Sequence, residues 1–200
     1  MVSPILAFIA AHPDWAVLVI GLTAFGESFA FVSLLFPGTA ILIAAGALSS
    51  TGALNPFAAA IAGIIGAVVG DAVSFWLGRK FGPLIPKLWP FTAHPEALAQ
   101  SSRFFARYGG ASVFIGRFSG PLRAVVPLSA GMLGMPVLHF YVANILSALI
   151  WAPALLLFGK FLGHTLAGGR GIEHMILFGL LVLAAAGLAI LWTRKRFFKG

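Results

Sequence analysis

The sequence predicts an all-α integral membrane protein: two re-entrant helical hairpins in an inverted repeat, packed with about three transmembrane helices. First, 60% of the 200 residues are hydrophobic, only 9% are charged, and the mean hydropathy is +1.02. A soluble domain carries about 25% charged residues, so the excess apolar side chains must face lipid. Second, Gly and Pro pairs interrupt the apolar runs at two matching places. Third, an acid, Glu27, lies inside the first of these runs.

The first predicted hairpin joins the apolar runs 15–36 and 39–48 across a break at Pro37-Gly38. The second run is too short to cross a membrane, which takes about 20 residues. A carboxylate at the centre of a membrane helix costs about 2.5–3.5 kcal/mol, so Glu27 must face protein, water or a ligand. Non-helical backbone is tolerated at this depth only where it is buried or lines a cavity. We therefore expect a polar site at the hairpin tip.

A full span and a polar connection follow the first hairpin. After the polar turn 49–55, Pro56 begins an apolar run that extends to residue 78 and completes the first half, 15–78. Small residues at Gly63, Gly66 and Gly70 give this span a face for close helix packing. Residues 79–109 are rich in proline and in basic side chains, which predicts a cytoplasmic or interfacial connection. Within it, 96–108 is expected to form an amphipathic surface helix.

The second half, 110–159, repeats the order of the first half with a second break at Gly120-Pro121. A final span, 173–193, and a basic tail, 194–200, complete a single membrane domain over 1–200. The positive-inside rule places the connection and the tail in the cytoplasm, so the two hairpins enter from opposite sides. Interrupted, inverted repeats of this kind are typical of transporters. The second half consists of an arm to Phe118, the break, a short arm over 124–134 and a full span over 136–159.

The charged residues next to the two breaks predict an anion site. If the hairpin tips meet, Glu27 faces both Arg117 and Arg123, which leaves one positive charge in excess. Such a site suits a phosphate or carboxylate headgroup. The alternative is that the acid and the arginines form a structural pair that holds the hairpins together. Further substrate-binding candidates at the tips are Gly38, Thr39 and Gly120; supporting candidates are Pro37 and Pro121, and Asp71 with Arg79, which are expected to form a structural pair, an interfacial anchor or a route for substrate.

Several chemistries are excluded by composition and spacing. The chain contains no cysteine, and its five histidines show no metal-ligand spacing. There is no nucleophile–His–Asp set and no nucleotide-binding loop. We therefore expect no metal, no cofactor and no enzymatic activity. The net charge of +8 is interpreted as contact with anionic lipid headgroups and not with nucleic acid.

Four stretches of the sequence carry a pattern that resembles the DedA family of bacterial inner-membrane proteins, also described by the VTT or SNARE-associated domain. The likeness spans about residues 15–160, and the stretch with two arginines is its most specific part. The stretches are Glu27 with Pro37-Gly38 and Ala45-Gly46; Gly70-Asp71 to Trp76-Leu77-Gly78-Arg79; Arg107-Tyr108-Gly109; and Phe114-Ile115-Gly116-Arg117-Phe118 with Arg123, Val126-Pro127 and Ala130-Gly131.

Two positions depart from the family pattern. Many members have an acid after the first Pro-Gly, where this chain has Thr39, so the second acid attributed to proton coupling in some members is missing. Members also often have proline three residues after the first arginine, where this chain has Gly120 followed by Pro121. This combination is typical of a subgroup.

The resemblance implies a multi-pass protein of the bacterial inner (plasma) membrane, with its C-terminus in the cytoplasm, that translocates lipid. Its partner would be a polyprenyl phosphate, such as undecaprenyl phosphate, or a phospholipid headgroup, moved by flippase or scramblase activity. The alternatives are a proton-coupled antiporter of small cations or drugs with Glu27 as the proton carrier, a non-transporting scaffold, and a membrane phosphatase. The phosphatase lacks its His/Asp nucleophile set, and the missing second acid weakens the antiporter.

Overall fold

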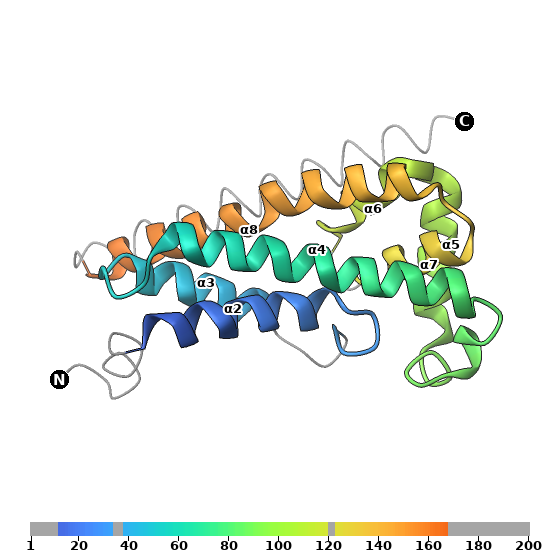
Figure 1. The fold of residues 1–200 in the computed structure, drawn as a ribbon, viewed down its shortest axis with the longest axis horizontal. Coiled ribbons are helices and arrows are strands. Elements are labelled where there is room, and N and C mark those ends of the chain that lie inside the picture. The colour runs from blue at the N-terminus through green and yellow to red at the C-terminus, as the bar shows by residue number, and fades with distance from the viewer. Residues whose placement is uncertain (1–11, 34–37, 120–122, 168–200) are drawn as a thin grey trace.

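The computed structural model describes residues 12–33, 38–119 and 123–167, and all regular elements within these ranges are helical. Two long helices, α4 (Pro56–Phe81) and α8 (Val137–Ala167), run along the molecule in opposite directions (Figure 1). Both are long and apolar enough to cross a membrane, as the sequence predicts for 56–78 and 136–159. The third predicted span and the basic tail lie outside the described residues.

Helices α2 (Pro13–Ser28) and α3 (Gly38–Ser49) lie in the half of the molecule where α4 begins (Figure 1). The apolar run predicted to reach residue 36 is helical only to Ser28. Its 16 residues give a helix of about 24 Å, which is shorter than the ~30 Å hydrocarbon core.

The early end of α2 has a cause in α4. The Ala30 N–H donates to Ser74 Oγ at 3.0 Å, and the same hydroxyl oxygen lies 3.4 Å from the Ser28 carbonyl oxygen. Because Ser74 Oγ accepts from the Ala30 N–H, the chain can leave the helix in a buried position without leaving this donor unpaired. The single Ser74 hydroxyl proton is shared between the Gly70 carbonyl oxygen at 3.0 Å and that of Ser28. The end of α2 therefore depends on a residue in another helix.

The other half of the molecule contains α5 (Pro95–Tyr108), α6 (Ser112–Gly116) and α7 (Val125–Met132) (Figure 1). Helix α5 confirms the predicted amphipathic helix, with Leu98 buried and Arg103 exposed. Two short 3₁₀ helices, Ile85–Lys87 and Gly109–Ala111, flank it. The arm predicted to begin at residue 110 forms only a five-residue α-helix after the second of these.

Glycines allow the helices to pack backbone against backbone. A Cβ added to Gly66 of α4 would lie 2.1 Å from the Gly21 carbonyl oxygen of α2, which confirms the predicted small-residue face. Helix α3 contacts α8, where a Cβ on Gly46 would lie 2.2 Å from the Leu156 carbonyl oxygen. Helix α7 contacts α4, where a Cβ on Gly131 would meet a carbonyl oxygen of α4 at 2.0 Å. Helices α3 and α7 therefore each pack on the long helix of the other half.

Gly131→Ala is expected to destabilise the protein by about 1–3 kcal/mol, because its methyl group would overlap the Phe75 carbonyl oxygen. Gly110→Ala is the matched control, since the nearest atom to its added Cβ is Met135 Cε at 3.8 Å. Thermal unfolding of both variants in detergent measures the difference. Equal unfolding temperatures would contradict the close contact between α4 and α7.

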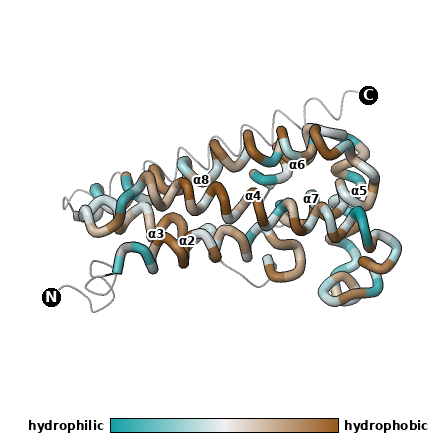
Figure 2. Tube along the Cα trace, viewed as in Figure 1, coloured by the Kyte–Doolittle hydropathy of each residue, from teal (hydrophilic) through white to brown (hydrophobic). Residues whose placement is uncertain are grey.

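The outer surface of the described residues is strongly apolar. Figure 2 shows apolar positions along most of α2, α3, α4 and α8, with polar positions gathered toward the two ends of the molecule. Soluble monomers rarely expose large continuous apolar patches, so this surface is suited to lipid. The exposed side chains include Trp15, Leu18 and Leu22 of α2, Phe57, Ile61, Ile65 and Val69 of α4, and Leu138, Val142, Ile145 and Leu149 of α8.

Candidate functional site

A buried ion pair joins the two sequence breaks. Arg123 Nη1 donates to Glu27 Oε1 at 2.6 Å, and the Thr39 hydroxyl donates to the same carboxylate oxygen. Glu27 lies in the last turn of α2, Thr39 in the first turn of α3, and Arg123 just before α7. Their contact brings together the chain on both sides of the first break and the chain just after the second. The Glu27 and Arg123 side chains are 8% and 10% exposed.

Arg117 forms a second buried pair, with Asp71 of α4. Its side chain is 2% exposed and that of Asp71 is 5% exposed. Arg117 Nη2 also donates to Asn144 Oδ1 at 2.6 Å, and Arg117 Nε donates to Ser147 Oγ at 2.8 Å. Asn144 Nδ2 in turn donates to the Val68 carbonyl oxygen at 3.0 Å. Helices α4, α6 and α8 thus meet around one guanidinium group.

Trp151 of α8 links the two pairs. The Arg123 Cζ lies 4.1 Å from the centroid of the Trp151 ring, and the Arg117 Cζ lies 5.9 Å from it. The ring is buried at 5% exposure. A cation over an aromatic face is stabilised by about 2 kcal/mol or more when desolvated, so Trp151 favours both guanidiniums at this place. We call Glu27, Asp71, Arg117, Arg123 and Trp151 the arginine cluster.

The sequence alone predicts no role for Trp151, Asn144 or Ser147. Trp151 could have been identified from its position. It lies in the middle of a predicted span, whereas tryptophan is enriched at the membrane interfaces. An isolated Asn or Ser in an apolar run gives no comparable signal, because such residues also serve ordinary helix–helix hydrogen bonds.

The predicted pairing of Asp71 with Arg79 is wrong. The two residues are eight positions apart on one helix, which separates them by about 12 Å along its axis. Arg79 Nη1 instead donates to the Met135 carbonyl oxygen at 3.1 Å, and its guanidinium lies over the Phe75 and Trp76 rings. Arg79 therefore holds the end of α4 to the segment before α8.

The predicted excess of one positive charge is also wrong, because Asp71 supplies a second acid to the cluster. Charge is balanced among these four described residues, but hydrogen bonding is not. Three buried atoms of the arginine cluster have no hydrogen-bond partner within residues 12–33, 38–119 and 123–167: Glu27 Oε2, Arg117 Nη1 and Arg123 Nη2. An unsatisfied buried polar group costs about 1–3 kcal/mol, and more when charged. The cluster therefore retains donors and an acceptor for a further polar group.

The remaining candidates lie at the breaks themselves. Gly38 is the first residue of α3, next to Thr39. Pro37, Gly120 and Pro121 lie outside the described residues. The arginine cluster thus comes from α2, α4 and α8, from the residue that caps the end of α6, and from the chain two residues before α7.

Comparison with known proteins places the chain in a family. The VTT domain matches residues 36–161. The inner membrane protein YabI of Escherichia coli is 36% identical over 187 residues, which cover 93% of this chain and 72% of that protein. The Escherichia coli protein DedA is 30% identical over 185 residues, which cover 88% of this chain and 81% of the relative.

A relative of similar sequence identity occurs in another bacterium. An uncharacterized membrane protein of Mycobacterium tuberculosis is 34% identical over 191 residues, which cover 92% of this chain and 85% of that protein. No solved structure matches the chain. With a domain match over more than half of its length and relatives that are themselves membrane proteins, the chain belongs to the DedA family of membrane proteins, which share the VTT domain.

Proposed function

We propose that this protein moves a lipid with a phosphate headgroup, undecaprenyl phosphate or a phospholipid, across the inner membrane. The observation that carries the proposal is the pair of buried guanidinium nitrogens without a partner among the described residues, Arg117 Nη1 and Arg123 Nη2. Phosphate oxygens are strong acceptors that match the planar fork of arginine. A headgroup bound between the two arginines would satisfy both nitrogens while its hydrocarbon chain stayed in the lipid.

Protons are the second proposed partner. Glu27 and Asp71 already neutralise the two guanidiniums, so an arriving phosphate adds an uncompensated negative charge. Burying such a charge is unfavourable, and a proton that arrives with the headgroup would offset it. Glu27 is the proposed acceptor, because its Oε2 has no partner in the described part of the chain. The proposal needs no chemical reaction beyond this proton movement.

The proposed path rests on two re-entrant hairpins in an inverted repeat. The reciprocal packing of α3 on α8 and α7 on α4 supports it, because exchanging the two halves reproduces these contacts. In this arrangement each hairpin reaches the arginine cluster from its own side of the membrane, as in transporters with inverted repeats. The C-terminus is proposed to lie in the cytoplasm with the basic connection.

Cysteines introduced at Thr51 and Lys87 are expected to react with a membrane-impermeant reagent from opposite sides of the membrane. Both residues are exposed, and the chain has no cysteine of its own to interfere. Lys87 is expected on the cytoplasmic side, because basic residues are retained there. Labelling of both positions from one side would contradict the proposed topology.

One observation favours a second candidate function. A proton-coupled antiporter of small cations or drugs needs acids inside the membrane, and Asp71 joins Glu27 in the cluster. Both acids are paired with arginine, which repels a cationic substrate, so we rank this function below lipid movement. An internal pH change driven by added cations, in vesicles where no lipid moves, would favour the antiporter.

Reconstitution of the purified protein tests the proposed function. The protein is inserted into the membrane of vesicles that contain undecaprenyl phosphate, an anionic phospholipid or phosphatidylcholine. The exposure of the lipid headgroup on the outer face is then followed with time. We expect protein-dependent exposure of a phosphate-bearing lipid, with a rate that depends on a pH difference across the membrane. Rates equal to those of protein-free vesicles for all three lipids would overturn the proposal.

A further inference from the structure

A second feature, separate from the arginine cluster, is an apolar groove on the outer side of α4. Its volume is about 520 Å³. It follows one stripe of the helix from Val68 to Phe81, a length of about 20 Å at 1.5 Å per residue. This length is somewhat more than one leaflet of a ~30 Å hydrocarbon core. The groove is lined by Val68, Val69, Ala72, Val73, Trp76, Leu77, Lys80 and Phe81 of α4 and by Tyr141 of α8.

The walls of the groove come from two helices that are fixed to each other. Trp76 Nε1 donates to the Tyr141 hydroxyl oxygen at 3.1 Å, which ties α4 to α8 at this level. Trp76 is 47% exposed and Val73 is 37% exposed, so both are accessible to a lipid chain. The groove lies on the exposed face of α4, whereas Asp71 on the same helix is buried in the arginine cluster.

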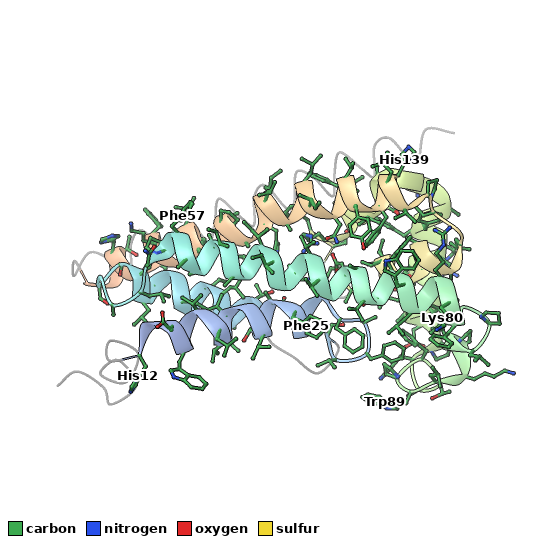
Figure 3. The ribbon with its side chains drawn as sticks, in the orientation of Figure 1. His12, Phe25, Phe57, Lys80, Trp89 and His139 are labelled. Carbon is green, nitrogen blue, oxygen red and sulfur yellow. The ribbon has the colours of Figure 1, made fainter. Side chains whose placement is uncertain are left out.

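One end of the groove is positively charged. Lys80 is exposed and lies near the end of α4 opposite Phe57 (Figure 3). Its ammonium lies 5.3 Å from the Phe81 ring centroid, and it forms no salt bridge with the residues that the structure describes. No acidic residue lines the groove. An apolar groove that ends at the Lys80 ammonium is complementary to a lipid with an anionic headgroup.

We propose that this groove binds an anionic phospholipid, with one acyl chain along α4 and the phosphate at Lys80. Trp76 and Tyr141 lie next to the charged end, where amphipathic aromatic side chains contact the headgroup region. A lysine near the membrane surface strengthens the binding of anionic lipid by about 1 kcal/mol, which is about fivefold in affinity. The inference does not rest on the proposed function, because it requires no movement of lipid.

The position of Trp76 in the groove wall makes it the reporter. The complete chain is reconstituted in phosphatidylcholine vesicles that contain increasing fractions of phosphatidylglycerol brominated on its acyl chains, which quenches nearby tryptophan. A parallel series uses phosphatidylcholine brominated in the same way. The Trp76→Phe variant gives the fluorescence of the other four tryptophans, and subtracting it isolates the signal of Trp76.

We compare the fractions of the two brominated lipids that each quench half of the Trp76 fluorescence. The fraction of brominated phosphatidylglycerol is expected to be about fivefold lower than that of brominated phosphatidylcholine. Lys80→Gln should abolish this difference, and high salt should reduce it in the unchanged chain because exposed charges are screened. Lys87→Gln, an exposed lysine outside the groove, should leave it unchanged. Equal quenching by the two lipids, or a preference that persists in Lys80→Gln, would overturn the proposal.

Arg117→Lys provides the separation from the proposed function. This variant is expected to keep the lipid preference of Trp76 while it loses lipid movement, because Arg117 does not line the groove. A preference that disappears in Arg117→Lys and remains in Lys80→Gln would assign the anionic lipid to the arginine cluster and not to the groove.

Discussion

Replacing Arg117 with lysine is expected to slow lipid movement by about 100-fold although the positive charge is retained. Arg117 donates to Asp71, Asn144 and Ser147 through two different nitrogens, and its third nitrogen is the one left for a ligand. A lysine has a single ammonium and cannot reach these positions together. Loss of two charge-assisted hydrogen bonds at about 1.5 kcal/mol each corresponds to a rate reduced by about 100-fold. The measurement is headgroup exposure in reconstituted vesicles.

Arg103→Lys is the matched control for this substitution. Arg103 lies on the exposed face of α5, outside the arginine cluster, so its replacement should leave the rate unchanged. Thermal unfolding of both variants separates lost transport from lost folding. If Arg117→Lys moved lipid at the rate of the unchanged chain, the site would need only a charge there, and the proposed two-arginine headgroup site would have to be abandoned.

Replacing Glu27 with glutamine is expected to lower both stability and transport, and a second substitution separates the two effects. The single variant leaves the Arg123 guanidinium buried without its counter-charge, and breaking a buried ion pair by removing one partner costs about 3–5 kcal/mol. In the double variant Glu27→Gln with Arg123→Gln, both charges are gone and much of the stability should return. Transport should remain lost, because the acid and one phosphate-binding arginine are absent.

Thermal unfolding in detergent and headgroup exposure on vesicles are measured on the same three preparations: the unchanged chain, the single variant and the double variant. This comparison tests the alternative that the Glu27–Arg123 pair only holds the two hairpin tips together. A double variant that recovers both stability and transport would establish that alternative. Recovery of stability alone supports a role in transport.

The sequence was sufficient to predict the long helices and the meeting of Glu27 with Arg123. Length and apolar composition identify α4 and α8, because few other segments can cross a membrane. Charges inside a membrane must find partners, so the acid beside the first break was expected to meet both arginines beside the second; Glu27 meets Arg123, whereas Arg117 pairs with Asp71. Glycine positions were similarly informative, because close helix packing requires small residues.

Neither the partners of Arg117 nor the end of α2 could be predicted from the sequence, and the reason is the same for both. Each depends on a contact between residues far apart in sequence: Arg117 with Asp71 of α4, and Ala30 with Ser74 of the same helix. Local propensity contains no information about which helices become neighbours. Asp71 was assigned to Arg79 because the two are close in sequence, although the helix separates them.

The exchange of packing partners between the halves restricts how the protein can open. Helix α3 is held against α8 through Gly46, and α7 is held against α4 through Gly131, so a hinge that parted the halves would break both contacts together. A shear movement, in which one short helix slides along the long helix it touches, preserves backbone contact throughout. Under the proposed function, access to the arginine cluster from the two sides of the membrane would therefore involve alternate sliding of α3 along α8 and of α7 along α4, while the two long helices keep their positions.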